Sequence, residues 1–160
     1  MSDTDNDKVV LIVDDEEMVL SSISSFLELE TSYKVVTFTE PGKALEYVNE
    51  NSIDLVISDY LMPHMNGIQF LSKMKEVMPQ VPRIILTGYA DKENAIKAIN
   101  DVGLFQYIEK PWDNDDILLI IRNGLERKEL MKKLDDKISQ INAAYSELQG
   151  LHKEIVKTFI

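Results

Sequence analysis

A single acidic residue at the end of a short apolar run is the feature that most constrains this chain. The run Leu55-Val-Ile-Ser is followed directly by Asp59. A short apolar run rich in β-branched residues is typical of a strand that is buried on both faces of a sheet. Asp59 would then lie at the carboxyl end of a central strand, where open α/β sheets bind their ligands. Packing does not explain an acid at this position.

Four other runs have the same character and alternate with helical patterns. The predicted strands are residues 8–13, 33–38, 53–58, 83–86 and 104–108. Five strand–helix pairs predict an α/β fold with a five-stranded parallel sheet and helices on both faces. Polar residues follow every strand except the second. This pattern predicts the strand order 2-1-3-4-5, a doubly wound, flavodoxin-like sheet whose switch point lies between strands one and three.

The composition excludes several classes of protein. The chain has 160 residues, of which 44% are hydrophobic, and it has no cysteine. Disulfides and thiolate metal sites are therefore excluded. The net charge of −11 argues against non-specific nucleic-acid binding, and no apolar stretch is long enough to cross a membrane. The polar, acidic start lacks the features of a signal peptide, so we expect a cytoplasmic protein.

Five polar side chains would gather at one edge of this sheet. Asp14 and Asp15 follow the first strand, Asp59 the third, Thr87 the fourth and Lys110 the fifth. Unpaired carboxylates repel one another, and a hard divalent cation such as Mg²⁺ relieves that repulsion. A metal, a free acid, a lysine and a hydroxyl are the groups needed for phosphoryl transfer to a carboxylate. Each residue alone could be a turn or cap residue, but their joint placement favours a site.

These residues also carry a resemblance to a known family. The segments Val13-Asp14-Asp15, Asp59-Tyr-Leu-Met-Pro-His-Met-Asn-Gly67, Leu86-Thr87-Gly88 and Tyr107-Ile-Glu-Lys110-Pro111 resemble the receiver domain of two-component response regulators, over about residues 8–124. Receivers take a phosphoryl group from a phosphohistidine on a sensor histidine kinase or phosphotransfer protein, using Mg²⁺. The resemblance implies that Asp59 is the phosphoacceptor.

The resemblance assigns the remaining site residues as well. It implies that Asp15 and Asp59 bind the metal by carboxylate, Leu61 by its backbone carbonyl, and Asp14 mostly through water. Thr87 and Lys110 would contact the phosphoryl oxygens. By the same resemblance, Tyr107 matches the aromatic residue that turns inward when Thr87 moves, and the Lys110–Pro111 peptide is expected to be cis. Receivers are not enzymes beyond this self-phosphorylation and self-dephosphorylation.

Two further positions bear on how long the phosphoryl group survives. Leu61, two residues after the acceptor, offers no polar group to guide water, and Tyr89, two residues after Thr87, is bulky. In the family that the chain resembles, these positions tune self-hydrolysis. We therefore expect a long-lived phosphoryl group. His64 is expected to be a solvent-facing loop residue.

The chain continues as a helix beyond the receiver-like part. Steps of three and four residues form a heptad a/d seam, which predicts a coiled coil over residues 125–160. The seam is Met131, Leu134, Ile138, Ile141, Tyr145, Leu148, His152, Ile155 and Phe159. We expect residues 1–7 to be disordered, 8–124 to form the receiver, and 125–160 to pair as a parallel homodimer. The helix would pass the signal to an output domain beyond Ile160 or to a partner protein, and a cyclic-dinucleotide phosphodiesterase is the first candidate for that domain.

Two other functions remain open at this point. A haloacid-dehalogenase-type phosphatase also forms an aspartyl phosphate on a parallel sheet, but it places its nucleophile after the first strand in an Asp-x-Asp pattern, which Asp14-Asp15-Glu16 does not match. A coiled-coil interaction scaffold would keep the acids only as remnants. DNA binding by these residues is not expected, because no recognition-helix module follows the receiver-like part.

Overall fold

The strands of the sheet are the apolar runs of the sequence. The computed structural model describes residues 7–159, so the predicted disorder of residues 1–7 lies, apart from Asp7, outside the described residues. The five strands are β1 Val9–Val13, β2 Lys34–Phe38, β3 Leu55–Asp59, β4 Arg83–Thr87 and β5 Gln106–Glu109. They form one all-parallel sheet in the order β2-β1-β3-β4-β5. The predicted fold and strand order are confirmed.

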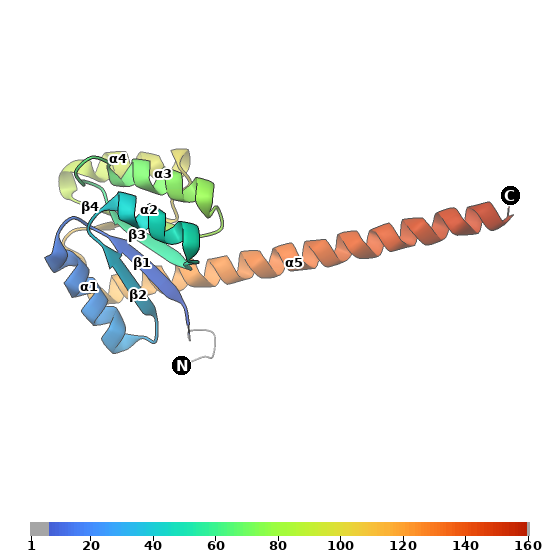
Figure 1. The fold of residues 1–160 in the computed structure, drawn as a ribbon, viewed down its shortest axis with the longest axis horizontal. Coiled ribbons are helices and arrows are strands. Elements are labelled where there is room, and N and C mark those ends of the chain that lie inside the picture. The colour runs from blue at the N-terminus through green and yellow to red at the C-terminus, as the bar shows by residue number, and fades with distance from the viewer. Residues whose placement is uncertain (1–6, 160) are drawn as a thin grey trace. The chain divides into compact units, whose positions relative to one another are not determined.

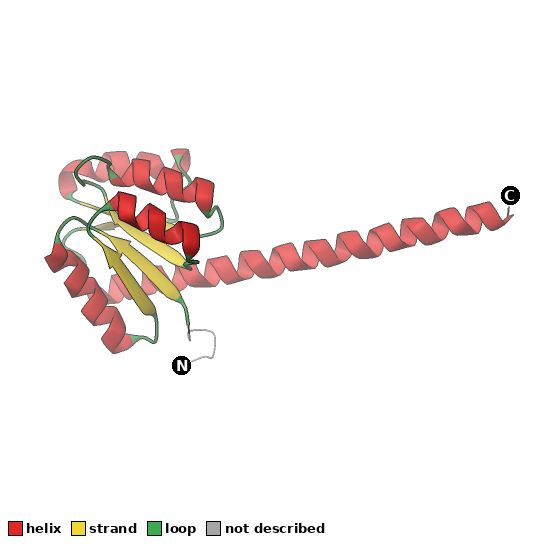
Figure 2. Cartoon of the chain, viewed as in Figure 1, coloured by secondary structure: helices red, strands yellow, loops and turns green. Residues whose placement is uncertain are grey.

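Helices cover both faces of the sheet (Figures 1 and 2). They are α1 Glu17–Glu30, α2 Pro41–Glu50, α3 Gly67–Val77, α4 Lys92–Asp101 and α5 Asn114–Phe159, and a short 3₁₀ turn, η1 Tyr89–Asp91, precedes α4. Successive strand residues point to opposite faces, so each strand feeds two cores. One core joins the sheet to α2, α3 and α4, and the other joins it to α1 and α5.

Local sequence explains most helix ends. Pro41 is the first residue of α2, where its missing N–H costs nothing. Asn66 and Gln69 form a reciprocal capping box at the start of α3. Asp113 accepts a hydrogen bond of 2.9 Å from the Asp115 N–H at the start of α5.

Some predicted details differ in the structure. Strand β5 begins two residues later than predicted, at Gln106, and ends at Glu109. Asp91 precedes α4 without a side-chain cap hydrogen bond, since the 3₁₀ turn η1 leads directly into the helix.

The long last helix spans two compact units, with the boundary after Leu125. Within the first unit, Ile117, Ile121 and Leu125 are buried against the sheet. In the second unit, large apolar side chains such as Leu134 (52%) and Ile141 (65%) are exposed. No helix among residues 7–159 has both the length and the apolar composition that a membrane span requires.

Candidate functional site

Three carboxylates meet where β1 and β3 end. Val13 pairs with Ser58 across the two strands, so the next residues, Asp14 and Asp59, lie side by side at the carboxyl edge of the sheet. Asp15 joins them, and one oxygen from each of the three acids lies within 4.8 Å of the other two. Asp14 is fully buried and Asp59 is 6% exposed, whereas Asp15 faces solvent. The structure thus brings together the three acids that the sequence predicted.

Lys110 provides the cation of this cluster. Its Nζ lies 3.0 Å from Asp59 Oδ1 and 3.3 Å from Asp14 Oδ2. Its backbone N–H donates a hydrogen bond of 2.9 Å to the carbonyl of Thr87, which ties the end of β5 to the end of β4. The Lys110–Pro111 peptide is cis, as predicted.

The charges of the cluster disturb one another because they share a buried site. Burial raises the pKa of Asp14 to about 6, the negative charge of Asp59 adds to this, and hydrogen bonds from the Glu16 N–H and from Lys110 oppose it. Burial also raises the pKa of Asp59, while the hydrogen bond from Lys110 lowers it. Burial alone would lower the pKa of Lys110, but its two acidic partners raise it. Lys110 therefore does not fully compensate the negative charge of Asp14 and Asp59 in the metal-free protein.

This imbalance predicts that neutralising Asp14 stabilises the metal-free protein. An acid whose pKa is raised in the fold binds more protons folded than unfolded, so stability falls as pH rises through the window from 3.8 to about 6. Asp14→Asn should therefore raise the free energy of unfolding at pH 8 by about 1–2 kcal/mol. At pH 5 the gain should be about half as large, because pH 5 lies near the middle of that window: the folded wild type keeps Asp14 mostly protonated, whereas the unfolded chain ionises it.

Urea denaturation in the presence of a chelator, at both pH values, measures this difference. Asp101→Asn, which neutralises an exposed acid on α4, is the control and should change stability little at either pH. A gain from Asp14→Asn that is equal at pH 5 and pH 8 would contradict the expectation.

The acidic cluster fits a magnesium ion. Mg²⁺ takes oxygen ligands, is bound in proteins through one or two carboxylates, and keeps several waters. The three grouped oxygens offer that donor chemistry. The pKa values of Asp14 and Asp59 are raised mainly by burial and further by the neighbouring acids, and a bound cation would relieve both effects. Leu61, predicted to add a carbonyl ligand, lies in the loop after β3 with its side chain 61% exposed.

The loop after Asp59 is held by its backbone. The Tyr60 N–H donates to the carbonyl of Leu86 on β4, and the Gly67 N–H donates to the carbonyl of Tyr60, both at 2.8 Å. A Cβ placed on Gly67 would collide with the carbonyl oxygen of Asp59. In the sequence Gly67 stands out only as the last residue of the segment that begins at Asp59, so its close approach to the candidate acceptor is a site feature that the sequence reasoning missed. His64 is exposed, as predicted, and has a positive φ of 71°.

The two predicted switch residues lie on neighbouring strands. Thr87 is fully buried at the end of β4, and its Oγ1 donates a hydrogen bond of 3.1 Å to the carbonyl of Gly88. Tyr107 is half-buried on β5, where it packs against the core on the α4 side of the sheet. Ile85 is the β4 partner of Tyr107, so Tyr107 lies two residues back along the sheet from Thr87.

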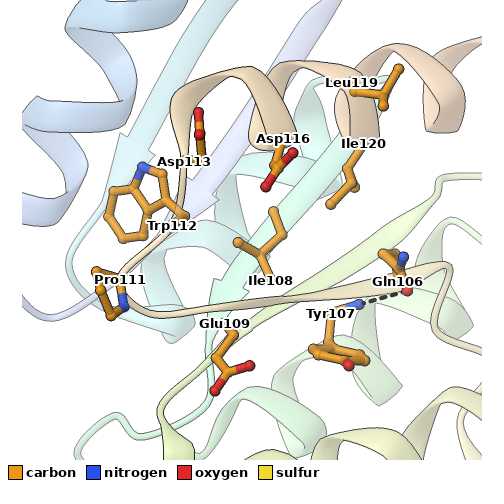
Figure 3. Close-up of a pocket in the computed structure, with 10 residues that line it drawn as sticks. All are labelled: Gln106, Tyr107, Ile108, Glu109, Pro111, Trp112, Asp113, Asp116, Leu119 and Ile120. Atoms are coloured by element: carbon orange, nitrogen blue, oxygen red, sulfur yellow. Dashed lines mark hydrogen bonds between the residues drawn. The ribbon is translucent and has the colours of Figure 1, made fainter.

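An open pocket of about 350 Å³ lies along β5 and the start of α5. Figure 3 shows Tyr107 and Glu109 on one side of β5, and Ile108 and Trp112 on the other. Glu109 forms an ion pair of 3.2 Å with Lys92 of α4 on the side that holds Tyr107. The sequence did not reveal this ion pair, because only the pairing of β5 with β4 brings residues 92 and 109 together.

Comparison with known families identifies this arrangement. The family model described as the response regulator receiver domain matches residues 10–122. The chain belongs to the response regulator receiver family of two-component systems. This match contains the whole sheet except Val9, the first residue of β1, and it contains every residue of the site described above.

Two longer relatives match this chain over part of their own length. The response regulator protein TmoT of Ectopseudomonas mendocina is 30% identical over 96% of this chain, which spans 69% of TmoT. The hydrogenase transcriptional regulatory protein HoxA of Cupriavidus necator is 31% identical over 82% of this chain. The aligned region is 28% of HoxA, so this chain spans less than a third of that relative's length.

Solved structures agree with the fold and the family. A response regulator receiver domain from Clostridium thermocellum is 36% identical, covers 78% of this chain and 98% of its own, and has a TM-score of 0.73. The signal receiver domain of an HD domain-containing protein from Pseudomonas fluorescens is 31% identical, with the same coverages and a TM-score of 0.72. Both solved receiver domains therefore have the same fold as this chain.

Proposed function

We propose that Asp59 accepts a phosphoryl group from the phosphohistidine of a sensor histidine kinase or phosphotransfer protein. The observation that carries this proposal is the buried contact of 3.0 Å between Asp59 and Lys110, with Asp14 and Asp15 beside it. A carboxylate oxygen of Asp59 attacks the phosphorus, the bond from phosphorus to the imidazole nitrogen breaks, and the phosphoryl group is left as an acyl phosphate.

The neighbouring side chains have distinct roles in this proposal. Lys110 stabilises the charge on the transferred group as a point charge, and Thr87 donates a hydroxyl hydrogen bond to it. Asp15, Asp59 and the Leu61 carbonyl would hold Mg²⁺, with Asp14 acting mostly through water. The bound ion would supply positive charge that offsets the negative charge of the acceptor and of the phosphoryl group.

Phosphorylation would act on the rest of the domain through β4 and β5. A hydroxyl drawn toward the phosphoryl group moves Thr87 away from its present acceptor, the carbonyl of Gly88. The space released on that side lets Tyr107 turn inward, and this would alter the surface along β5 and the start of α5 (Figure 3). Such a change is a two-state equilibrium biased by local electrostatics.

The helical segment 125–160 would carry this state onward. Its exposed heptad seam supports self-association, with a homodimer as the smallest assembly. The output would be a downstream effector domain or a partner protein, and a cyclic-dinucleotide phosphodiesterase remains the first candidate.

Chemical labelling tests the proposed function directly. The purified chain is incubated with acetyl phosphate, which replaces the kinase as donor, and the phosphorylated fraction is measured by intact-mass spectrometry. Mg²⁺ should be required, so a chelator should reduce labelling to background. A chain that stays unmodified at saturating donor and Mg²⁺ would overturn the proposal and favour the interaction-scaffold alternative.

The phosphoryl group should be long-lived. Neither exposed Leu61 nor exposed Tyr89 offers a side chain suited to positioning an attacking water at the acceptor. We expect a half-life well beyond seconds, and Leu61→Asn should shorten it several-fold, because an amide can hold water. Loss of labelled protein with time after removal of the donor measures the half-life. Ser72→Asn, on α3, is a control that should leave the half-life unchanged.

The phosphatase alternative makes a different prediction. A haloacid-dehalogenase-type enzyme would hydrolyse an added phosphomonoester with many turnovers. We expect no such turnover, since the proposed acceptor follows β3 rather than β1. Sustained release of product from p-nitrophenyl phosphate would revive that alternative.

A further inference from the structure

The apolar face of residues 126–159 is wider than the seam of a two-stranded coiled coil. With Met131 at position a and Leu134 at d, apolar residues also fall beside the seam at Leu130, Ala144, Leu151 and Val156. Three of these side chains are large and exposed: Leu130 at 57%, Leu151 at 56% and Val156 at 38%. Most charged residues of the segment lie away from this face: Lys132, Lys133, Asp136, Glu147, Lys153, Glu154 and Lys157.

The flanking positions lack the charges that specify a pair of helices. Two-stranded coils use opposite charges at e and g, and in a parallel pair each g residue lies beside the e residue five positions further along the partner. Here Leu130 would lie beside Asp135, Lys137 beside Asn142, and Leu151 beside Val156. None of these pairs is an ion pair. The last pair is wholly apolar, and in a dimer its two side chains would stay partly exposed to solvent.

The seam residues also depart from the pattern of parallel dimers. Such dimers favour a β-branched residue at a and leucine at d, whereas isoleucine at d shifts the preference toward more strands. Only Ile138 is β-branched among the described a residues, which also include Met131 and Tyr145. Two of the four d residues, Ile141 and Ile155, are isoleucine.

We propose that residues 126–159 of four copies of this chain form a four-helix bundle. This inference rests on the proposed self-association and deepens it. Helices of such bundles bury about three apolar positions per heptad, namely a, d and one flank. From Leu130 to Ile155 the a, d and g positions present this stripe, interrupted only by Lys137 at g and His152 at a. Further copies of the chain are the natural occupant, because each brings the same apolar stripe and the same charge-poor flank. The bundle would therefore present four receiver domains to one output.

Light scattering and sedimentation equilibrium on the full 160-residue chain test the stoichiometry. Mass is measured with and without Mg²⁺ and beryllofluoride, which mimics the phosphoryl group, and the larger value is used. The expected mass is four times the chain mass of 18.3 kDa. The double variant Leu130→Lys/Leu151→Lys should halve it, because lysines at g disrupt the wide face but leave the a/d seam intact.

A control variant and the measured number of chains distinguish the four-helix bundle from self-association in general. The control Ser139→Lys/Ser146→Lys adds the same charge at b positions and should leave the mass at four chains. Circular dichroism confirms that the helix persists, and labelling by acetyl phosphate confirms that the receiver is folded. A wild type of two or three chains overturns the four-helix bundle but keeps self-association. A monomer under every condition overturns both.

Discussion

Replacing Asp59 by asparagine should reduce labelling by acetyl phosphate to background. The amide oxygen is a poor nucleophile, so no acyl phosphate forms at this position. The variant should nevertheless fold well, because it removes a buried carboxylate whose pKa burial raises and retains an oxygen that can accept from Lys110. Intact-mass spectrometry with Mg²⁺ and acetyl phosphate measures the labelled fraction.

The controls locate the modified residue. Asp101→Asn removes an exposed carboxylate on α4 and should be labelled like wild type. Asp15→Asn leaves the acceptor in place but removes a proposed metal ligand, so it should raise the Mg²⁺ concentration needed for half-maximal labelling rather than abolish labelling at saturation. Wild-type labelling of Asp59→Asn would mean that another residue is the acceptor.

Gly67→Ala should be the most destabilising small substitution near the site. A Cβ at Gly67 would overlap the carbonyl oxygen of Asp59 and approach the Tyr60 Cα at 3.1 Å. These are backbone atoms held by the β3–β4 pairing, so they cannot move aside without disturbing the sheet edge. Overpacking against rigid neighbours costs about 3 kcal/mol. That loss lowers the melting temperature by roughly 10 °C, which calorimetry or thermal circular dichroism measures.

A second glycine in the chain supplies the matched control. Gly150 lies inside α5 with open space around its missing Cβ. Gly150→Ala should raise helix stability by about 1 kcal/mol, because alanine is the better helix former. Gly67→Ala with an unchanged melting temperature would mean that the loop after β3 relaxes freely. Gly67→Ala should also be labelled more slowly than wild type at temperatures well below its melting temperature, because the displaced carbonyl belongs to the proposed acceptor.

The fold could be predicted closely because each strand has its own local signal. Continuous apolar runs marked β1, β3 and β4, and polar residues after four of the five strands indicated the strand order. The site followed from the same logic, because carboxyl ends of parallel strands share one edge. The predicted residues Asp14, Asp15, Asp59 and Lys110 do meet there.

The packing roles of two glycines could not be predicted from the local sequence. Gly124 lies inside the last helix, where helix propensity alone makes a glycine cost roughly 1 kcal/mol against alanine. In the structure an added Cβ at Gly124 would lie 2.9 Å from Leu55 Cδ1 and 3.3 Å from a ring carbon of Phe105. A side chain here would push α5 off the sheet, so the glycine permits close packing of the helix. Gly67 and Gly124 have the same side chain, and only their neighbours differ.

The sequence by itself determined the strand order, the identity of the charged residues at the sheet edge and the heptad seam of the tail. Each depends on the spacing of residues along the chain, which secondary structure converts directly into position. Only the tertiary structure decided the distances within the site, the raised pKa values of Asp14 and Asp59, and the Lys92–Glu109 ion pair. These depend on burial and on contacts between segments far apart in sequence, and the packing of helices on the sheet sets both.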